Sequence, residues 1–171
     1  MNNRSIFFKE VLKINNYEIN NLTLAIIPIS ETKTKIIEEK KEIIIEFSSM
    51  KIIENSCRFF GSSYEGRLKG THSLINIKSK SPIIIEETGK IIFFPTTSAR
   101  LSKCIWLSLN NIFNYYENKD ETLIEFSCGK KIIVPFSYGI IDNQVLRATR
   151  LFYVISNRIE KMEKKYKKRV I

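Results

Sequence analysis

The residues from Asp142 to Lys168, DNQVLRATRLFYVISNRIEKMEKKYKK, form the longest periodic pattern in this 171-residue chain. Apolar residues recur there at alternating steps of three and four, the spacing of one face of an α-helix: Val145, Ala148, Phe152, Ile155, Ile159, Met162 and Tyr166. The opposite face is basic: Arg147, Arg150, Asn157, Lys161, Lys164 and Lys168. Asp142 suits the N-cap position. The pattern predicts a long amphipathic C-terminal helix at about 142–168.

Three interpretations of this helix are open. The apolar stripe packs on a sheet and the cations face water, since most helices gain their stability from packing. The stripe also forms a dimer seam, because three heptads are close to the minimum for a coiled coil. The basic face contacts phosphate groups. The second and third interpretations are compatible with each other.

Upstream of the helix, short β-branched and aromatic runs separated by turn residues indicate strands. We expect them at Tyr17–Ile19, Thr23–Pro28, Lys35–Glu38, Glu42–Phe47, Ser73–Ile77, Pro82–Glu86, Lys90–Pro95, Ile105–Leu109, Thr122–Phe126 and Lys131–Phe136. Ser49–Arg58 has helical spacing but would also suit a strand. The expected fold is α+β: a single domain over residues 1–171, mainly antiparallel β-sheet with short helices and the long C-terminal helix.

Charge is distributed unevenly along the chain. The net charge is +10, and residues 51–104 carry nine basic against four acidic side chains. Residues 143–171 carry nine against two, whereas residues 105–142 carry three against five. Localised positive charge of this kind favours a polyanionic partner, because each neutralised phosphate releases counterions. An anionic membrane surface or simple solubility would also fit this charge. No apolar run approaches the ~20 residues that span a bilayer, and we expect nucleic acid rather than a membrane as the partner.

The residue types that metal and enzyme sites need are scarce. The three cysteines are far apart and in no CxxC spacing, which favours reduced thiols in a cytoplasm. His72 is the single histidine, and no nucleophile has a spacing that pairs with it. In GSSYEGRLKG, Arg67 and Leu68 stand where a phosphate-binding P-loop needs Lys and Ser or Thr. We expect no enzyme, no catalytic residue, no metal site and no cofactor.

Two glycine- or hydroxyl-rich stretches in the basic middle block remain as candidate binding loops. The first is CRFFGSSYEGRLKGTH at 57–72, and the second is FFPTTSAR at 93–100. Hydroxyl groups and free backbone N–H groups position phosphates, and a neighbouring arginine can enter a narrow minor groove. For either loop alone, capping, turn formation and local pairing of its arginines with acidic residues is the better explanation. Both loops within one basic block favour nucleic acid.

Three blocks of the sequence resemble the competence transcription factor ComK family. They are CRFFGSSYEGR at 57–67, FFPT at 93–96 and PFSYGIIDNQVLRA at 135–148, in matching order and separation. The resemblance implies a bacterial activator of competence (DNA-uptake) genes that binds AT-rich promoter boxes chiefly through the minor groove. It further implies homodimers that pair into tetramers, RNA polymerase as a partner, an adaptor of a Clp protease, and a cytoplasmic, nucleoid-associated location.

We therefore expect a DNA surface built from the two loops and the start of the last helix. The candidate DNA-binding residues are Arg58, Ser62, Ser63, Arg67, Lys69, Arg100, Lys103, Arg147 and Arg150. Arg147 and Arg150 would flank it as phosphate contacts. Two other classes stay open: a single-strand or RNA binder that uses exposed aromatic residues, and a shortened ComK-like paralogue that acts as a protein-interaction module.

Overall fold

A computed structural model of the chain describes residues 16–88 and 90–167. The strands in these ranges are β1 Thr23–Pro28, β2 Thr34–Glu38, β3 Glu42–Ile45, β4 Ile83–Glu86, β5 Ile91–Pro95, β6 Trp106–Ser108, β7 Ile112–Asn118, β8 Glu121–Phe126 and β9 Lys131–Val134. The helices are α1 Ser49–Phe59, α2 Tyr64–Ile75 and α3 Tyr138–Lys167, with one 3-10 turn, η1, at Leu109–Asn111.

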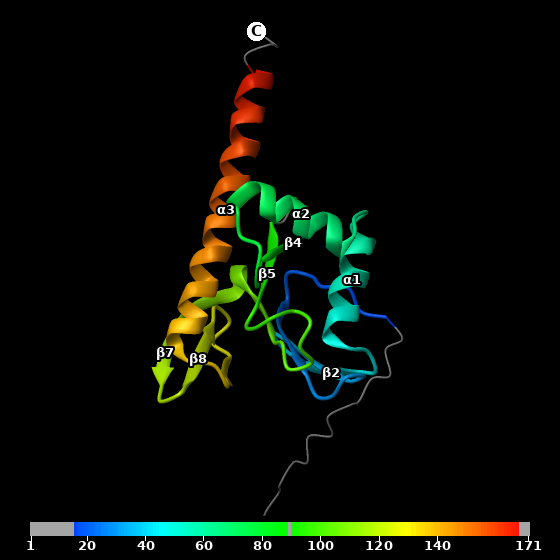
Figure 1. Cartoon of the computed structure of the whole chain (residues 1–171), viewed down its shortest axis with the longest axis vertical. Helices are drawn as coiled ribbons and strands as arrows, with labels where there is room; N and C mark the ends of the chain where they lie inside the picture. Colours follow the sequence, from blue (N-terminus) through cyan, green and yellow to red (C-terminus); the bar gives the residue numbers. More distant parts are fainter. Residues whose placement is uncertain (1–15, 89, 168–171) are drawn as a thin grey trace, which may run out of the picture.

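The strands form two antiparallel sheets. One has six strands in the order β3-β2-β1-β6-β5-β4, and the other has three in the order β7-β8-β9. Every pairing in both sheets is antiparallel. Helix α3 runs along one side of the molecule, and its C-terminal part extends beyond the rest (Figure 1). The predicted α+β class, with a mainly antiparallel sheet and a long C-terminal helix, is confirmed.

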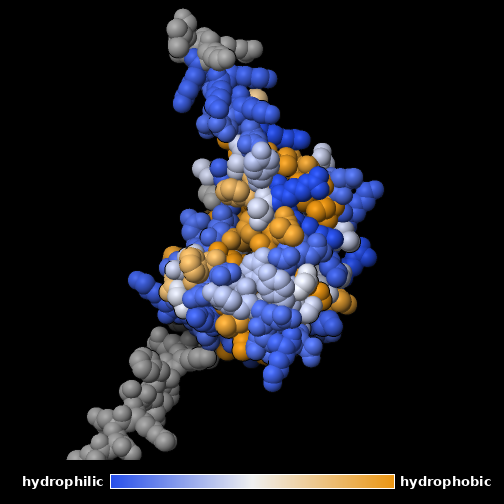
Figure 2. Space-filling model, turned by 90° about the vertical axis from the view of Figure 1, so that its left-hand side faces the viewer, coloured by the Kyte–Doolittle hydropathy of each residue, from blue (hydrophilic) through white to orange (hydrophobic). Residues whose placement is uncertain are grey.

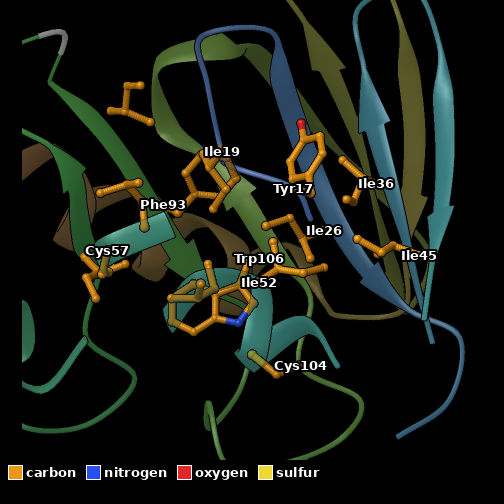
Figure 3. Packing of buried hydrophobic residues seen from close by; sticks show 14 of the residues in the cluster. Tyr17, Ile19, Ile26, Ile36, Ile45, Ile52, Cys57, Phe93, Cys104 and Trp106 are labelled. Carbon is orange, nitrogen blue, oxygen red and sulfur yellow. The ribbon is translucent and has the colours of Figure 1, made fainter. Parts of the chain in front are cut away.

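Both faces of the six-stranded sheet are buried, which explains why its strands read as nearly continuous apolar runs. On one face, Phe93 and Trp106 pack with Ile52 of α1 (Figure 3). On the other face, the neighbouring Phe94 packs with Leu151 of α3. Successive side chains of a strand point to opposite faces, so β5 serves both clusters. Burying each such aromatic ring contributes roughly 2–3 kcal/mol.

Most of the expected strands are confirmed to within three residues, but two are wrong and one was missed. Residues 17–19 form no strand: the Ile19 N–H donates to Ser56 Oγ at 3.0 Å, and the Tyr17 hydroxyl donates to Glu38 Oε1 at 2.8 Å. These contacts take the place of a ladder. Residues 73–75 belong to the end of α2, Asn76 is its left-handed cap at φ 55°, and Ile77 follows the cap without regular structure. Strand β7 does not fit the apolar strand pattern, because three of its seven residues, Asn114, Glu117 and Asn118, are polar.

The glycine-containing stretch expected as a loop is mostly helix, which corrects the sequence interpretation. Ser63 caps α2 by accepting from the Gly66 N–H at 3.0 Å. A Cβ at Gly66 would lie 3.1 Å from that Ser63 Oγ, so glycine leaves room for the cap. Gly61, at φ +73°, turns the chain between α1 and α2. The two glycines within α2 and its weak apolar periodicity concealed the helix.

Helix α3 begins at Tyr138, four residues before the predicted N-cap. Ser137 C=O accepts from the Ile141 N–H at 3.2 Å, and Asp142 instead accepts from the Tyr115 hydroxyl at 2.7 Å. Lys168, the predicted last residue, lies outside the described ranges. Tyr166, at the far end of the apolar stripe, is 71% exposed. Figure 2 shows mostly hydrophilic residues on this projecting end and apolar residues on the body below it.

Searched over its described residues, the chain contains no helix that is both long and apolar enough to cross a membrane.

Candidate nucleic-acid interface

Arg67 lies on α2 and is engaged within the protein. Its Nη1 forms an ion pair with Glu87 in the turn between β4 and β5, and its side chain is 13% exposed. Burial raises the pKa of the Cys57 thiol to about 11, and the Arg67 charge partly opposes that rise. The guanidinium therefore lies between α1, α2 and the β4–β5 turn. This position holds α2 in place and leaves little of Arg67 to reach a ligand.

The other candidates near the start of α2 differ in their exposure and in whether they have partners within the protein. Lys69 is exposed and pairs with Glu65 at 2.9 Å along the helix. This pair raises the pKa of Lys69 and lowers that of Glu65. Ser62 is half-buried and donates its backbone N–H to Cys57 C=O at 2.9 Å. Arg58, in the last turn of α1, is exposed and has no partner among the described residues.

The second loop, residues 96–104, is a compact turn that presents two cations. Buried Thr96 fixes it, because its Oγ1 accepts from the Ile105 N–H at 3.1 Å and its own N–H donates to Ile105 C=O at 2.9 Å. Arg100 and Lys103 are exposed and unpaired within the described ranges. The loop is thus rigid at its base while both cations face solvent.

The start of α2 and this second loop meet around a hollow of about 520 Å³. Its lining includes Tyr64 and Leu68 of α2, Lys78 and Lys80 of the segment before β4, and Ser98 and Arg100 of the second loop. We call it the cationic hollow. Burial raises the pKa of the Tyr64 phenol, and the Arg100 charge opposes this shift, in keeping with their proximity. The two predicted loops therefore converge, through Tyr64 and Arg100 rather than through Arg67.

Helix α3 secures one wall of the cationic hollow. Arg147 Nη1 donates to Ser79 C=O at 2.9 Å, and Gln144 Nε2 donates to Lys80 C=O at 2.9 Å. Gln144, which is 1% exposed, also donates to Pro95 C=O. Arg147 thus braces this wall through Nη1, and its phosphate contact stays a prediction. Arg150 is exposed one turn further along α3.

Sequence reasoning missed Lys78 and Lys80. The signal was present in the letters NIKSKSP at 76–82, where two lysines and three polar residues precede a strand. The strand expected at Ser73–Ile77 covers the first two of these residues, and the two lysines that follow it are not among the candidates. In the same segment, Ser81 Oγ lies 3.2 Å from His72 Nε2 of α2, which gives the single histidine a structural contact.

The described residues offer little for metal chemistry. No group of three or more His, Cys, Asp or Glu side chains in residues 16–88 and 90–167 is arranged to hold a metal ion. Burial raises the pKa of the Cys104 thiol to about 11, so this thiol is protonated near neutral pH.

Comparisons with known proteins agree with the sequence resemblance. The family model of the ComK protein matches residues 14–160. The chain is 34% identical over 151 residues to the protein named competence transcription factor from Bacillus subtilis (strain 168), covering 86% of this chain and 79% of that protein. No solved structure matches the chain. On the family match, which spans most of its length, the chain belongs to the ComK family.

Proposed function

We propose that this chain is a transcription factor that activates competence genes by binding double-stranded DNA at AT-rich promoter boxes. The observation that carries the proposal is the family match over residues 14–160. The relative's printed name, competence transcription factor, supports the coarser part of it. Transcription factors are not enzymes, and we propose no catalytic activity.

Cations without protein partners are the groups best suited to contact DNA. Arg58, Arg100 and Lys103 are exposed and unpaired among the described residues. AT-rich minor grooves are narrow and strongly negative, so an arginine such as Arg58 prefers them without a full base code. Arg150 and Lys69 would neutralise flanking phosphates, and Ser62 and Ser63 would stay near the backbone. Arg67 and Arg147 support the surface from within.

The assembly and its partners follow from the proposed activity. A homodimer, or a pair of dimers, would present two such surfaces to boxes spaced along one duplex. RNA polymerase is the proposed partner of the DNA-bound activator, and a Clp protease adaptor is the proposed partner that removes it. We propose that it acts in the cytoplasm, on the nucleoid.

Duplex binding titrated against salt tests the proposal. We expect the full chain to bind an AT-rich duplex more tightly than a GC-rich duplex of equal length. We also expect log affinity to fall linearly with log salt concentration, with a slope of about −0.9 per neutralised phosphate. Equal affinity for the two duplexes would refute minor-groove recognition. Failure to bind either duplex at physiological ionic strength, with the mass of the oligomer measured in parallel, would refute the DNA-binding function.

A further inference from the structure

The segment between α2 and β4 carries two lysines that the protein itself leaves without partners. Lys78 and Lys80 are exposed, and neither forms an ion pair within the described ranges. The backbone of this segment, in contrast, is hydrogen-bonded within the protein, because side chains of α3 donate to the carbonyl groups of Ser79 and Lys80. The segment is therefore held through its main chain, and its ammonium groups remain available.

These lysines line the cationic hollow together with Arg100, from a segment about twenty residues further along the chain. No acidic side chain occurs among the described residues that line this hollow. Three cations that line one hollow with no acidic side chain in its lining repel one another, and a bound anion would relieve that repulsion. The hydroxyl group of Ser98 and the aromatic edge of Tyr64 complete a lining of hydrogen-bond donor and apolar surface.

We propose that the cationic hollow is a binding site for a phosphodiester group of the DNA backbone. Lys78, Lys80 and Arg100 supply the positive charges, and Ser98 donates a hydrogen bond to a phosphate oxygen. The site rests on the proposed DNA-binding function and adds Lys78 and Lys80 to it. It contributes to affinity and register on the duplex but carries no sequence information.

The support of the hollow explains how such a contact gains strength. Gln144 and Arg147 hold the lysine segment against α3, so little backbone freedom is lost when a phosphate binds. Lys80 adopts a left-handed conformation at φ 49°, which fixes the direction in which its side chain leaves the main chain. Gln144 and Arg147 are positioning residues of this site.

The direct test removes both lysine charges. The variant Lys78→Gln/Lys80→Asn keeps polar side chains, and asparagine tolerates the left-handed conformation at position 80. The matched control, Lys33→Ala/Lys40→Ala, removes two exposed charges from turns of the six-stranded sheet. We expect the first variant to bind an AT-rich duplex about tenfold more weakly, with a salt slope shallower by about 0.9 per lost phosphate contact. The loss should be equal on a GC-rich duplex, and the control should stay close to the unaltered chain.

The outcomes separate this site from the function on which it rests. An unaltered chain that binds no duplex refutes the DNA-binding function. An unaltered chain that binds duplex, alongside a Lys78→Gln/Lys80→Asn variant that behaves like the control, refutes the hollow alone. A loss confined to the AT-rich duplex would also refute it, because a backbone contact cannot distinguish sequences.

A small phosphate compound has the same recognition chemistry, and inorganic phosphate provides the comparison. Trp106 is the single tryptophan, and its ring lies 6.4 Å from that of Tyr64, so its fluorescence reports on the hollow. We expect duplex DNA to change this emission in a saturable way and inorganic phosphate, at constant ionic strength, to leave it unchanged. A saturable response to phosphate that the lysine variant loses, with duplex binding intact in that variant, would assign the hollow to small phosphate compounds and overturn the proposal.

Discussion

The cationic hollow and the outer face of the three-stranded sheet differ in whether their charged side chains are paired with opposite charges. Strand pairing puts Tyr116, Leu123 and Ile133 in one row on that outer face, since directly paired residues share a face. Beside this row, Glu125 accepts from the Tyr116 hydroxyl at 3.0 Å and pairs with Lys131 at 3.3 Å. On the sheet, Glu125 and Lys131 form an ion pair, whereas no acidic side chain of the described ranges lines the hollow.

This difference identifies which part of a basic protein is available to an anion. The sequence assigns a surplus of charge to residues 51–104 as a block. The structure divides that block into cations with acidic partners, such as Arg67 and Lys69, and cations without them, such as Lys78 and Arg100. A single-strand or RNA binder would stack bases on exposed aromatic residues. Phe113 and Tyr116 of β7 are 71% and 41% exposed, so the three-stranded sheet offers such rings, and a competition of duplex DNA against RNA tests this alternative.

Breaking the link between the two regions should have the largest effect. Helix α3 joins them, because Gln144 binds the wall of the hollow and Asp142 binds Tyr115 of β7. We expect Gln144→Ala to lower the free energy of unfolding by about 3 kcal/mol, since it leaves the carbonyl groups of Lys80 and Pro95 without this donor. Urea denaturation measures the change, and Thr149→Ala, at an exposed position of α3, is the control. Equal stability of the two variants would contradict the bracing role of Gln144.

Removing one cation from each region compares them directly. We expect Arg100→Ala to weaken binding to an AT-rich and a GC-rich duplex equally, by about 2 kcal/mol, because Arg100 supplies one of the charges that hold a backbone phosphate in the hollow. Lys131→Ala removes the same charge from the outer face of the sheet and should change neither affinity. Similar losses for both variants, measured by fluorescence anisotropy, would show that net charge rather than position governs binding.

The smallest expected effect concerns Arg67, which is one of the paired cations within residues 51–104. We expect Arg67→Ala to lower the free energy of unfolding by about 1 kcal/mol, because it removes an ion pair whose Glu87 partner is well exposed. Any loss of DNA affinity should be equal on AT-rich and GC-rich duplexes, as it would arise from a displaced α2. Lys69→Ala, which breaks an exposed pair on the same helix, should leave stability nearly unchanged. A loss of affinity specific to AT-rich DNA would indicate that Arg67 itself contacts the minor groove.

The sequence predicted those parts of the structure whose apolar residues form clear local patterns. Short β-branched and aromatic runs between turn residues predicted β1, β5 and β8, and the apolar stripe predicted most of α3. Helix α2 could not be predicted in this way, because Gly66 and Gly70 lie within it and its apolar periodicity is weak. The candidate site was predicted only in part for a related reason. Pairing between Arg67 and Glu87, twenty residues apart, depends on the fold and leaves no local pattern.

The left-handed conformation of Lys80 has a consequence for how this chain can change. Lys80 and Lys119 both have positive φ, at 49° and 58°, which costs a lysine about 1 kcal/mol relative to glycine. At position 119, in the turn between β7 and β8, glycine would simply make the protein more stable. At position 80, glycine would bring the same gain in stability but would remove a charge from the hollow. If the hollow binds DNA, selection for stability and selection for activity act in opposite directions on a single side chain.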